Sequence, residues 1–465
     1  MLHVTPDSPF SIMALLFCGV LVCVFEVVNG FHDTANAVAT VIYTRSLRAG
    51  QAVLLSSLMN FLGVLAGGLS VAYAMVELLP ADVLSPPDGM PAVVMLLSLF
   101  GSALTWNLLT WWAGIPNSSS HCMIGAIVGV AVGDSLVHTR SLSEGVDWHQ
   151  VFKVLEALAV SPLLGMVGAW LFYLALRAMV KDAALYQPPK GEAPPRGWVR
   201  WLLVASCSGV SFSHGNNDGQ KSIGLIMLTV VGLLPALYAL NPQEAHRLPL
   251  PVAEAAQIET LLTRYDHDGL RPEALAAAAR LKAEALVAAA QGGAQNEPVV
   301  GTRPLMALRA DVFEILAGLK QVDYNASTPA VDRASAKTLR KHVQPVVEFA
   351  PWWVRLLSAL CLSFGTMIGY QRVVRTLGEK IGRTHLTPAQ GASAELVGAG
   401  LILTAGYTGL PVSTTHIITA GIAGSMMGAG SGVQGSMVAR IMLAWVATLP
   451  VTILMAAGLF YVLSP

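Results

Sequence analysis

Charged side chains are scarce in this sequence. Lys, Arg, Asp and Glu together make up 12% of its 465 residues, whereas hydrophobic residues make up 54%. A water-soluble domain of this length needs more charge on its surface, so the composition excludes an ordinary soluble protein and indicates one that contacts lipid. The formal net charge is zero and there is no basic tract of the nucleic-acid-binding type, so we expect no nucleic-acid partner.

Closely spaced cysteine pairs are also lacking. Metal sites and redox motifs require such pairs, whereas the five cysteines stand apart in apolar stretches. We therefore interpret them as small core residues. They are Cys18, Cys23, Cys122, Cys207 and Cys361.

Long apolar runs are abundant. A helix needs about 20 apolar residues to cross a bilayer, and the sequence therefore predicts an all-α polytopic membrane protein with about ten to twelve crossings. No basic segment precedes the first run and no convincing cleavage site follows it, so we expect a retained span rather than a signal peptide. The expected spans are 10–30, 51–78, 92–113, 119–137, 152–179, 199–240 (long enough for two), 352–370, 393–409, 413–430 and 437–462.

Residues 241–350 have a different composition. They hold 12 Lys or Arg and 13 Asp or Glu, which is 25 of the 56 charged residues in the chain. Such balanced charge is typical of a solvated face, so we expect a soluble helical insertion rather than a ligand site. The expected domains are a first membrane repeat (1–180), a basic cytoplasmic linker (181–198), the first part of a second membrane repeat (199–240), the insertion (241–350) and the remainder of the second repeat (351–465).

Two pairs of similar blocks recur along the chain, and each pair joins the first half to the second. Asp33 precedes His121 by 88 positions, whereas the equivalent residues Asp218 and His416 are 198 positions apart. The difference of 110 equals the length of the insertion, so the sequence predicts two homologous halves, the second of them interrupted. The matching blocks are 30–37 with 215–222 and 114–121 with 409–416, and Gly129 and Gly424 follow eight residues after the two histidines.

The charge of the short loops predicts an orientation. Short loops rich in Lys and Arg stay in the cytoplasm, and both the loop that joins the two halves and segment 372–383 are basic. If the first half begins outside and ends in that loop, each half crosses the membrane an odd number of times. The halves are then inverted repeats with discontinuous helices, as in many secondary transporters.

The second pair of blocks places hydroxyl side chains directly after a Gly and a Pro. Such residues break a helix, and the helix that follows begins with unpaired N–H groups that suit an anion. We predict that both segments bind an oxyanion; hydroxyls that only cap or join helices are the alternative. The residues are Ser118, Ser119 and Ser120 in the first half and Ser413, Thr414 and Thr415 in the second.

The first pair of blocks supplies acidic and amide side chains. Their oxygens are hard ligands for a small cation, and a cation or a proton would offset the charge of the anion. An ionisable residue inside a span is costly and therefore a functional candidate, with a structural polar contact as the alternative. We assign Asp33 and Asp218 to ion coupling and Asn36 and Asn217 to substrate binding.

Lys221 stands where the first half has Asn36. We hypothesise that its ammonium fills the space of a metal cation and favours coupling to protons over sodium; a side chain that extends to an interface is the alternative. His32 and His214 are candidates for a proton relay, because histidine titrates near neutral pH, or else neutral hydrogen-bonding residues. The same two interpretations apply to His121 and His416, which recur beside the second pair of blocks. Glu26 and Glu395 rank below the aspartates; they either accept coupling protons or pair with a basic side chain.

The blocks resemble the signatures of the inorganic phosphate transporter (PiT) family. Segment 29–37, Asn-Gly-Phe-His-Asp-Thr-Ala-Asn-Ala, is similar to the amino-terminal signature of that family. Segment 212–221, Phe-Ser-His-Gly-Asn-Asn-Asp-Gly-Gln-Lys, is similar to the second copy in bacterial low-affinity phosphate permeases. The paired Pro-x-Ser-Ser/Thr-Ser/Thr-His segments are similar as well, and the resemblance covers nearly all membrane segments.

The resemblance implies a symporter that imports inorganic phosphate across the inner membrane. In bacterial relatives the substrate is often a neutral complex with a divalent cation such as magnesium, driven by protons, whereas other members use sodium. No cofactor is implied, and a homo-oligomer is left open. The implied substrate and ion site comprises the aspartates, asparagines and hydroxyl segments named above, and Lys221 departs from the Asn of sodium-coupled members.

Two other classes of protein fit the sequence less well. An intramembrane hydrolase would use the Ser, His and Asp residues, but the sequence has no Gly-x-Ser-x-Gly or His-Glu-x-x-His motif. Duplication of the whole candidate site also suits a two-sided carrier better than an enzyme with one nucleophile. An anion channel is the remaining alternative.

Overall fold

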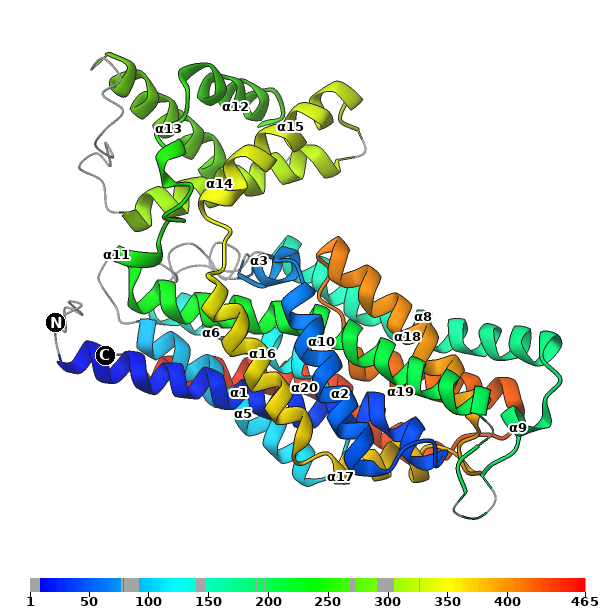
Figure 1. Ribbon diagram of the computed structural model, residues 1–465. Helices are drawn as coiled ribbons and strands as arrows, with labels where there is room; N and C mark the ends of the chain where they lie inside the picture. The colour runs from blue at the N-terminus through cyan, green and yellow to red at the C-terminus, as the bar shows by residue number, and fades with distance from the viewer. Residues whose placement is uncertain are drawn as a thin grey trace. The chain divides into compact units, whose positions relative to one another are not determined.

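The computed structural model describes residues 9–76, 78, 92–138, 148–189, 191, 193–195, 197–266, 272–290, 305–325 and 327–464. It divides the chain into two compact units (Figure 1). The inserted unit is Val230–Phe349, and the membrane unit comprises Asp7–Val83, Pro91–Thr229 and Ala350–Pro465.

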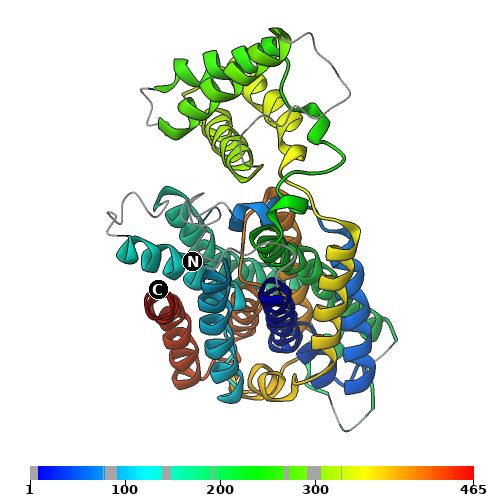
Figure 2. The ribbon, with the colours of Figure 1, turned by 90° about the vertical axis from the view of Figure 1, so that its left-hand side faces the viewer.

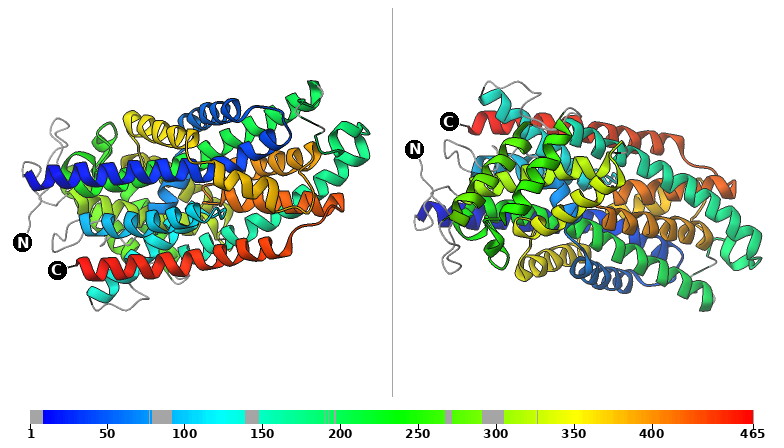
Figure 3. Two further views of the ribbon diagram at one scale, coloured as in Figure 1. Left: turned by 90° about the horizontal axis from the view of Figure 1, so that it is seen from below. Right: turned by 90° about the horizontal axis from the view of Figure 1, so that it is seen from above.

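The described part of the membrane unit is built of helices, and Figure 2 views α1 and α20 nearly along their axes. Figure 3 shows α1 beginning and α20 ending at the same end of the unit. The helices of the first half are α1 (Pro9–Tyr43), α2 (Ala49–Ala66), α3 (Ser70–Val76), α5 (Ala92–Trp112), α6 (Ser119–Val137), α8 (Trp148–Met179) and α9 (Ala183–Tyr186). Those of the second half are α10 (Gly197–Leu233), α16 (Trp352–Met367), α17 (Gln371–Arg375) with a π-helical turn (Thr376–Lys380), α18 (Pro388–Thr408), α19 (Thr414–Ala429) and α20 (Gly435–Leu463).

Six described helices are long and apolar enough to cross a membrane, and a seventh span results if the pair of α16 and the α17 segment, bent by 55°, counts as one. This count, made on length and composition, is below the ten to twelve crossings that we expected. Polar site residues lower the hydropathy of α10, and α19 has only 16 residues. The expectation of two spans in 199–240 was wrong, because α10 is one helix of 37 residues.

The helices that carry the two acidic blocks, α1 and α10, contact each other and run in opposite directions. Ser222 of α10 contacts Glu26 in the middle of α1, whereas Arg200, near the start of α10, donates from Nε to the carbonyl oxygen of Ser46, just after α1, at 2.9 Å. The two helices are therefore antiparallel. Neither acidic block interrupts its helix; the breaks lie between α5 and α6 and between α18 and α19.

The glycines that follow the repeated histidines allow helices of the two halves to cross closely. A Cβ atom on Gly129 of α6 would lie 2.4 Å from the carbonyl oxygen of Ile453 in α20. A Cβ atom on Gly424 of α19 would lie 2.0 Å from the carbonyl oxygen of Met166 in α8. Any side chain would separate these helices, so the repeated glycines have a packing role.

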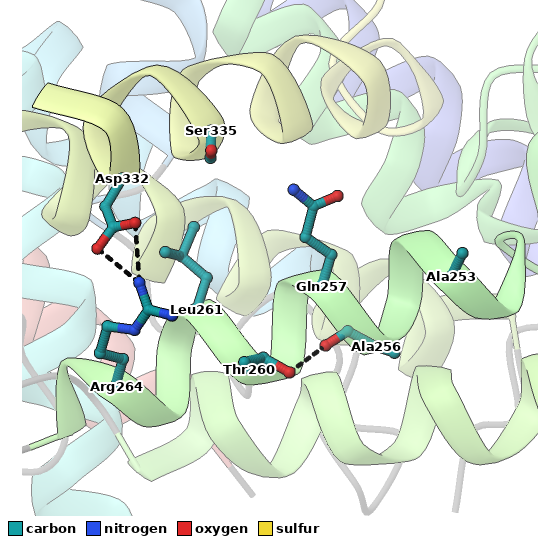
Figure 4. A pocket seen from close by; sticks show the side chains of 8 residues that line it. All are labelled: Ala253, Ala256, Gln257, Thr260, Leu261, Arg264, Asp332 and Ser335. Carbon is teal, nitrogen blue, oxygen red and sulfur yellow. Dashed lines mark hydrogen bonds and ion pairs between the residues drawn. The ribbon is translucent and has the colours of Figure 1, made fainter.

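The inserted unit contains α11 (Pro235–Tyr238), α12 (Val252–Arg264), α13 (Pro272–Ala290), α14 (Leu305–Tyr324) and α15 (Ala330–Val343) around an apolar core of its own. A groove of about 280 Å³ lies between α12 and α15 (Figure 4). At its edge Arg264 Nη1 lies 2.8 Å from Asp332 Oδ2. The hydroxyl of Tyr265, which donates to the same carboxylate at 2.6 Å, lowers the pKa of Asp332 together with this guanidinium. None of the predicted substrate residues lines this groove.

Candidate functional site

The repeated Gly-x-Pro-x-Ser segments end one helix and begin the next. Gly114 follows α5 with φ 66°, and Gly409 follows α18 with φ 74°, a left-handed conformation that favours glycine. Ser118 and Ser413 then cap α6 and α19, and their side chains accept hydrogen bonds from the backbone N–H three residues later at 3.1 and 3.2 Å. The two halves thus build the same helix start, and first-turn N–H groups at such a start suit an anion.

The carboxylate of Asp33 in α1 receives hydroxyl groups from both helix starts. Ser119 of α6 donates to Oδ2 at 3.0 Å, and Thr415 of α19 donates to Oδ1 at 2.5 Å. Nδ2 of Asn36, one turn later in α1, donates to the hydroxyl of Thr415 at 3.0 Å. Residues of both halves therefore meet at one acidic group.

The carboxylate of Asp218 in α10 is held by Lys221. The ammonium donates to Asp218 Oδ1 at 2.5 Å, to the hydroxyl of Ser120 at 2.7 Å and to the carbonyl oxygen of Val412 at 2.7 Å. Thr414 donates to the other carboxylate oxygen at 3.4 Å. An ammonium has three protons, and all three are used here.

His214 lies between the two carboxylates. Its Nε2 is 3.5 Å from Asp33 Oδ2 and 3.1 Å from Asp218 Oδ2. Its Nδ1 is 2.9 Å from Oδ1 of Asn60, whose Nδ2 donates to the hydroxyl of Thr366 at 2.9 Å, and that hydroxyl donates to a backbone carbonyl. This chain of bonds assigns the donor role to Nδ1, so Nε2 faces two acidic groups and needs a proton or a cation between them.

Three of these groups are placed to share a cation. One oxygen each of Asp33 and Asp218 and one nitrogen of His214 all lie within 4.8 Å of one another. Among the described residues, Oδ1 of Asn36 and both amide atoms of Asn217 are buried without a hydrogen-bond partner. Buried polar atoms rarely remain unpaired, so this cluster fits a polar or charged guest.

The other three histidines of the repeated blocks lie on α1, α6 and α19, the helices that supply groups to this cluster. Nδ1 of His32 is 4.0 Å from Asp33 Oδ1, and its Nε2 is 3.4 Å from Thr110 Oγ1. The rings of His121 and His416 pack together with centroids 4.4 Å apart, and Trp445 stacks on His416 at 3.8 Å. These two repeated histidines therefore contact each other rather than the carboxylates.

Sequence reasoning missed Asn60, Trp445 and the carbonyl oxygen of Val412. Asn60 had a detectable signal, because it is an amide side chain inside the expected span 51–78. The other two had none, since Trp is common in membrane helices and a backbone carbonyl leaves no trace in the sequence.

The predicted site residues that the structure brings together are all buried, at no more than 4% exposed. They comprise Asn36, Ser118, Ser119, Ser120, Asn217, Lys221, Ser413, Thr414, Thr415, the two aspartates and the two histidines next to them. A helical multi-pass protein with two anion-suited helix starts facing buried carboxylates has the architecture of a membrane carrier of a small charged solute.

The chain belongs to the phosphate transporter family, whose model matches residues 29–456. It is 37% identical over 488 aligned residues to the low-affinity inorganic phosphate transporter PitA of Escherichia coli strain K12, with 97% of this chain and 96% of the relative covered. It is 34% identical to the low-affinity inorganic phosphate transporter of Buchnera aphidicola subsp. Acyrthosiphon pisum, with 99% of each chain covered.

A solved structure described as the sodium-dependent phosphate transporter has a similar fold, with a TM-score of 0.55 and 20% identity over 97% of this chain and 99% of that one. The PiT resemblance of the sequence is thereby confirmed, as is the expectation of a transporter in a membrane rather than an enzyme.

Proposed function

We propose that this protein is a secondary symporter that imports inorganic phosphate together with protons. The observation that carries the proposal is that acidic groups, rather than a set of arginines, face the two helix starts. With Asp33, Asp218 and Lys221 ionised and His214 neutral, the cluster carries one net negative charge. An anion entering it needs compensating positive charge, because unpaired charge is expensive in a buried site.

The phosphate position follows from the helix starts. First-turn N–H groups and the hydroxyls of Ser119, Ser120, Thr414 and Thr415 supply donors for tetrahedral oxygens. The unpaired amide of Asn217 adds a donor and an acceptor. Several of these hydroxyls donate to the aspartates in this structure. Once a proton or a cation neutralises a carboxylate, its hydroxyl donors can turn to the bound phosphate instead.

The position of Lys221 favours protons over sodium as the coupling ion. Its ammonium occupies the position equivalent to Asn36 and makes the equivalent contact, to Ser120 where Asn36 contacts Thr415. A fixed positive charge there disfavours a sodium ion by repulsion. In the first half the amide oxygen of Asn36 stays unpaired.

A divalent cation is a second cargo that the cluster suits. Two carboxylates and an imidazole are ligands for such ions, and a metal–phosphate complex would cancel the charge of both partners. In that case Asp33, His214 and Asp218 hold the cation. Magnesium prefers oxygen ligands and so would favour the carboxylates over the imidazole.

The antiparallel course of α1 and α10 supports inverted repeats as the basis of two-sided access. We place the protein in the inner membrane with its basic loops in the cytoplasm. We propose the repeat boundaries that the sequence predicts, and an inserted unit that does not carry substrate.

Uptake of labelled phosphate into sealed proteoliposomes tests this function. With sodium absent and magnesium varied, an imposed pH gradient should drive accumulation. Asp33→Asn and Asp218→Asn should abolish it although membrane insertion is normal. Wild-type uptake rates in both variants would refute the assignment of the two aspartates to the site. Conductance without accumulation would indicate a channel, and cleavage of a chemical bond would indicate an enzyme.

The Lys221→Asn variant tests the coupling ion. It gives the second half the residue type that the first half has at the equivalent position. Removal of the ammonium should introduce a dependence of uptake on sodium. Unchanged ion dependence would contradict the role given to Lys221, and sodium-driven uptake by the unmodified protein would replace proton coupling.

A further inference from the structure

Two glutamates are buried in the membrane unit without a basic partner. Glu26 of α1 is 1% exposed and Glu395 of α18 is 0% exposed. Within the described residues, no Lys, Arg or His forms an ion pair with either carboxyl, and Oε1 of each has no hydrogen-bond partner. A buried carboxylate without a compensating positive charge is strongly destabilising, so burial favours the neutral acid.

The hydrogen bonds around the two carboxyls lead to the same conclusion independently. The hydroxyl of Ser222 contacts Oε2 of Glu26 and also a backbone carbonyl oxygen of its own helix at 3.0 Å. The hydroxyl of Ser206 contacts Oε2 of Glu395 and a backbone carbonyl oxygen at 3.0 Å in the same way. A hydroxyl has one proton and donates once. Both contacts are satisfied together when each serine donates to the backbone and accepts from a protonated glutamate.

The two carboxyls lie on opposite sides of the phosphate site along α1. Glu26 precedes Asp33 by seven residues, and Thr40 follows Asp33 by seven. A Cβ atom on Gly391, one turn before Glu395, would lie 2.0 Å from Cγ2 of Thr40, so α18 meets α1 at that level. With a rise of about 1.5 Å per residue, each level is about 10 Å from Asp33, in opposite directions.

The titratable groups that act on the two carboxyls bring no positive charge. For Glu26 these are Asp218 of α10, Cys23 of its own helix and Cys361 of α16. For Glu395 it is Cys207 of α10. Each is acidic or neutral, so none offsets the charge of a glutamate that has lost its proton.

We propose that Glu26 and Glu395 are the proton-carrying groups of the transport cycle, one on each side of the Asp33 level, and that both are protonated in this conformation. The proposal rests on the proton-coupled symport argued above. Loss of the proton breaks the carboxyl O–H bond and releases H⁺ to water, and the resulting carboxylate is tolerated only when a change of conformation admits water to it. Each glutamate would thus exchange its proton with one side of the membrane.

The test uses full-length Glu26→Gln and Glu395→Gln, since an amide mimics the neutral acid but cannot release a proton. Both variants should retain exchange of labelled phosphate between equal concentrations and lose accumulation driven by a pH gradient. Glu26→Asp and Glu395→Asp should restore accumulation. Asp134→Asn, which alters a buried carboxylate 3.0 Å from His138 Nδ1, is the control and should keep both activities.

A spectroscopic readout separates this proposal from the function on which it rests. Infrared spectra of the purified protein should show the C=O band of a protonated carboxylic acid, weakened in each Gln variant. Equal loss of exchange and accumulation would indicate a structural role and overturn the proposal, as would full accumulation by both Gln variants or an unchanged C=O band. If the unmodified protein accumulates phosphate only with sodium while the band is present, the proton-coupled function itself has failed.

Discussion

Removal of the Lys221 ammonium tests whether the site is held together by one buried ion pair. The ammonium is 2.5 Å from Asp218 Oδ1, and both residues are at most 3% exposed. Lys221→Met keeps much of the apolar stem but leaves the carboxylate with Thr414 at 3.4 Å and His214 at 3.1 Å. Loss of one partner of a buried pair costs about 3–5 kcal/mol, mainly because the other charge stays buried.

The reverse variant, Asp218→Asn, leaves the ammonium buried and should cost a similar amount. The double variant removes both charges, so its loss should be smaller than the sum of the two single losses by about 1–3 kcal/mol. His214 can take up a proton beside Asp218, so the cost of Lys221→Met should lie near the lower end of its range.

The assay is thermal unfolding of the purified variants in detergent, completed as a double-mutant cycle. Lys181→Met is the matched control, because the exposed Lys181 donates to the carbonyl oxygen of Arg177, and its effect should be within about 0.5 kcal/mol. Single losses that simply add in the double variant would refute the ion-pair reasoning.

Two further predictions concern packing and pH. Gly424→Ala should lower the stability of the membrane unit by about 1–3 kcal/mol, because its Cβ would lie 2.0 Å from the Met166 carbonyl oxygen; Gly400→Ala, with no atom within 4 Å, is the control in the same unfolding assay. In the inserted unit, Asp332 has a lowered pKa, so it adds stability above the unfolded pKa of about 4 that is lost as pH falls through the folded value. Asp332→Asn should therefore weaken the acid-induced loss of amide protection in α15, and an unchanged pH profile would contradict this.

The sequence predicted which residues meet but little of how they meet. The repeated motifs predicted that the hydroxyl segments and the acidic blocks share one site, and the structure brings Ser119 and Thr415 to the carboxylate of Asp33. The position of His214 between the two acids was not predictable, since it depends on the crossing of α1 and α10. Asn36 and Lys221 align in sequence, yet only the structure reveals their equivalent contacts.

Helix boundaries were predicted less well for a physical reason. Hydropathy detects residues that face lipid, whereas α10 and α19 bury polar residues inside the bundle. Residues 199–240 were long enough for two spans, but glycines inside this stretch, such as Gly219 and Gly224, do not interrupt the helix, and α10 runs unbroken to Leu233. The break before α6 was detectable because Gly114 and Pro116 mark it in the sequence.

The pattern of contacts explains why the site needs both halves. Asn36 of the first half contacts Thr415 of the second, and Lys221 of the second half contacts Ser120 of the first. Each acidic helix therefore depends on the hydroxyl segment of the opposite half, and neither half alone can complete the site. Because these exchanged contacts are hydrogen bonds to the groups proposed to bind phosphate and protons, occupancy of the site must alter the contacts between the halves, which is the coupling that a symporter requires.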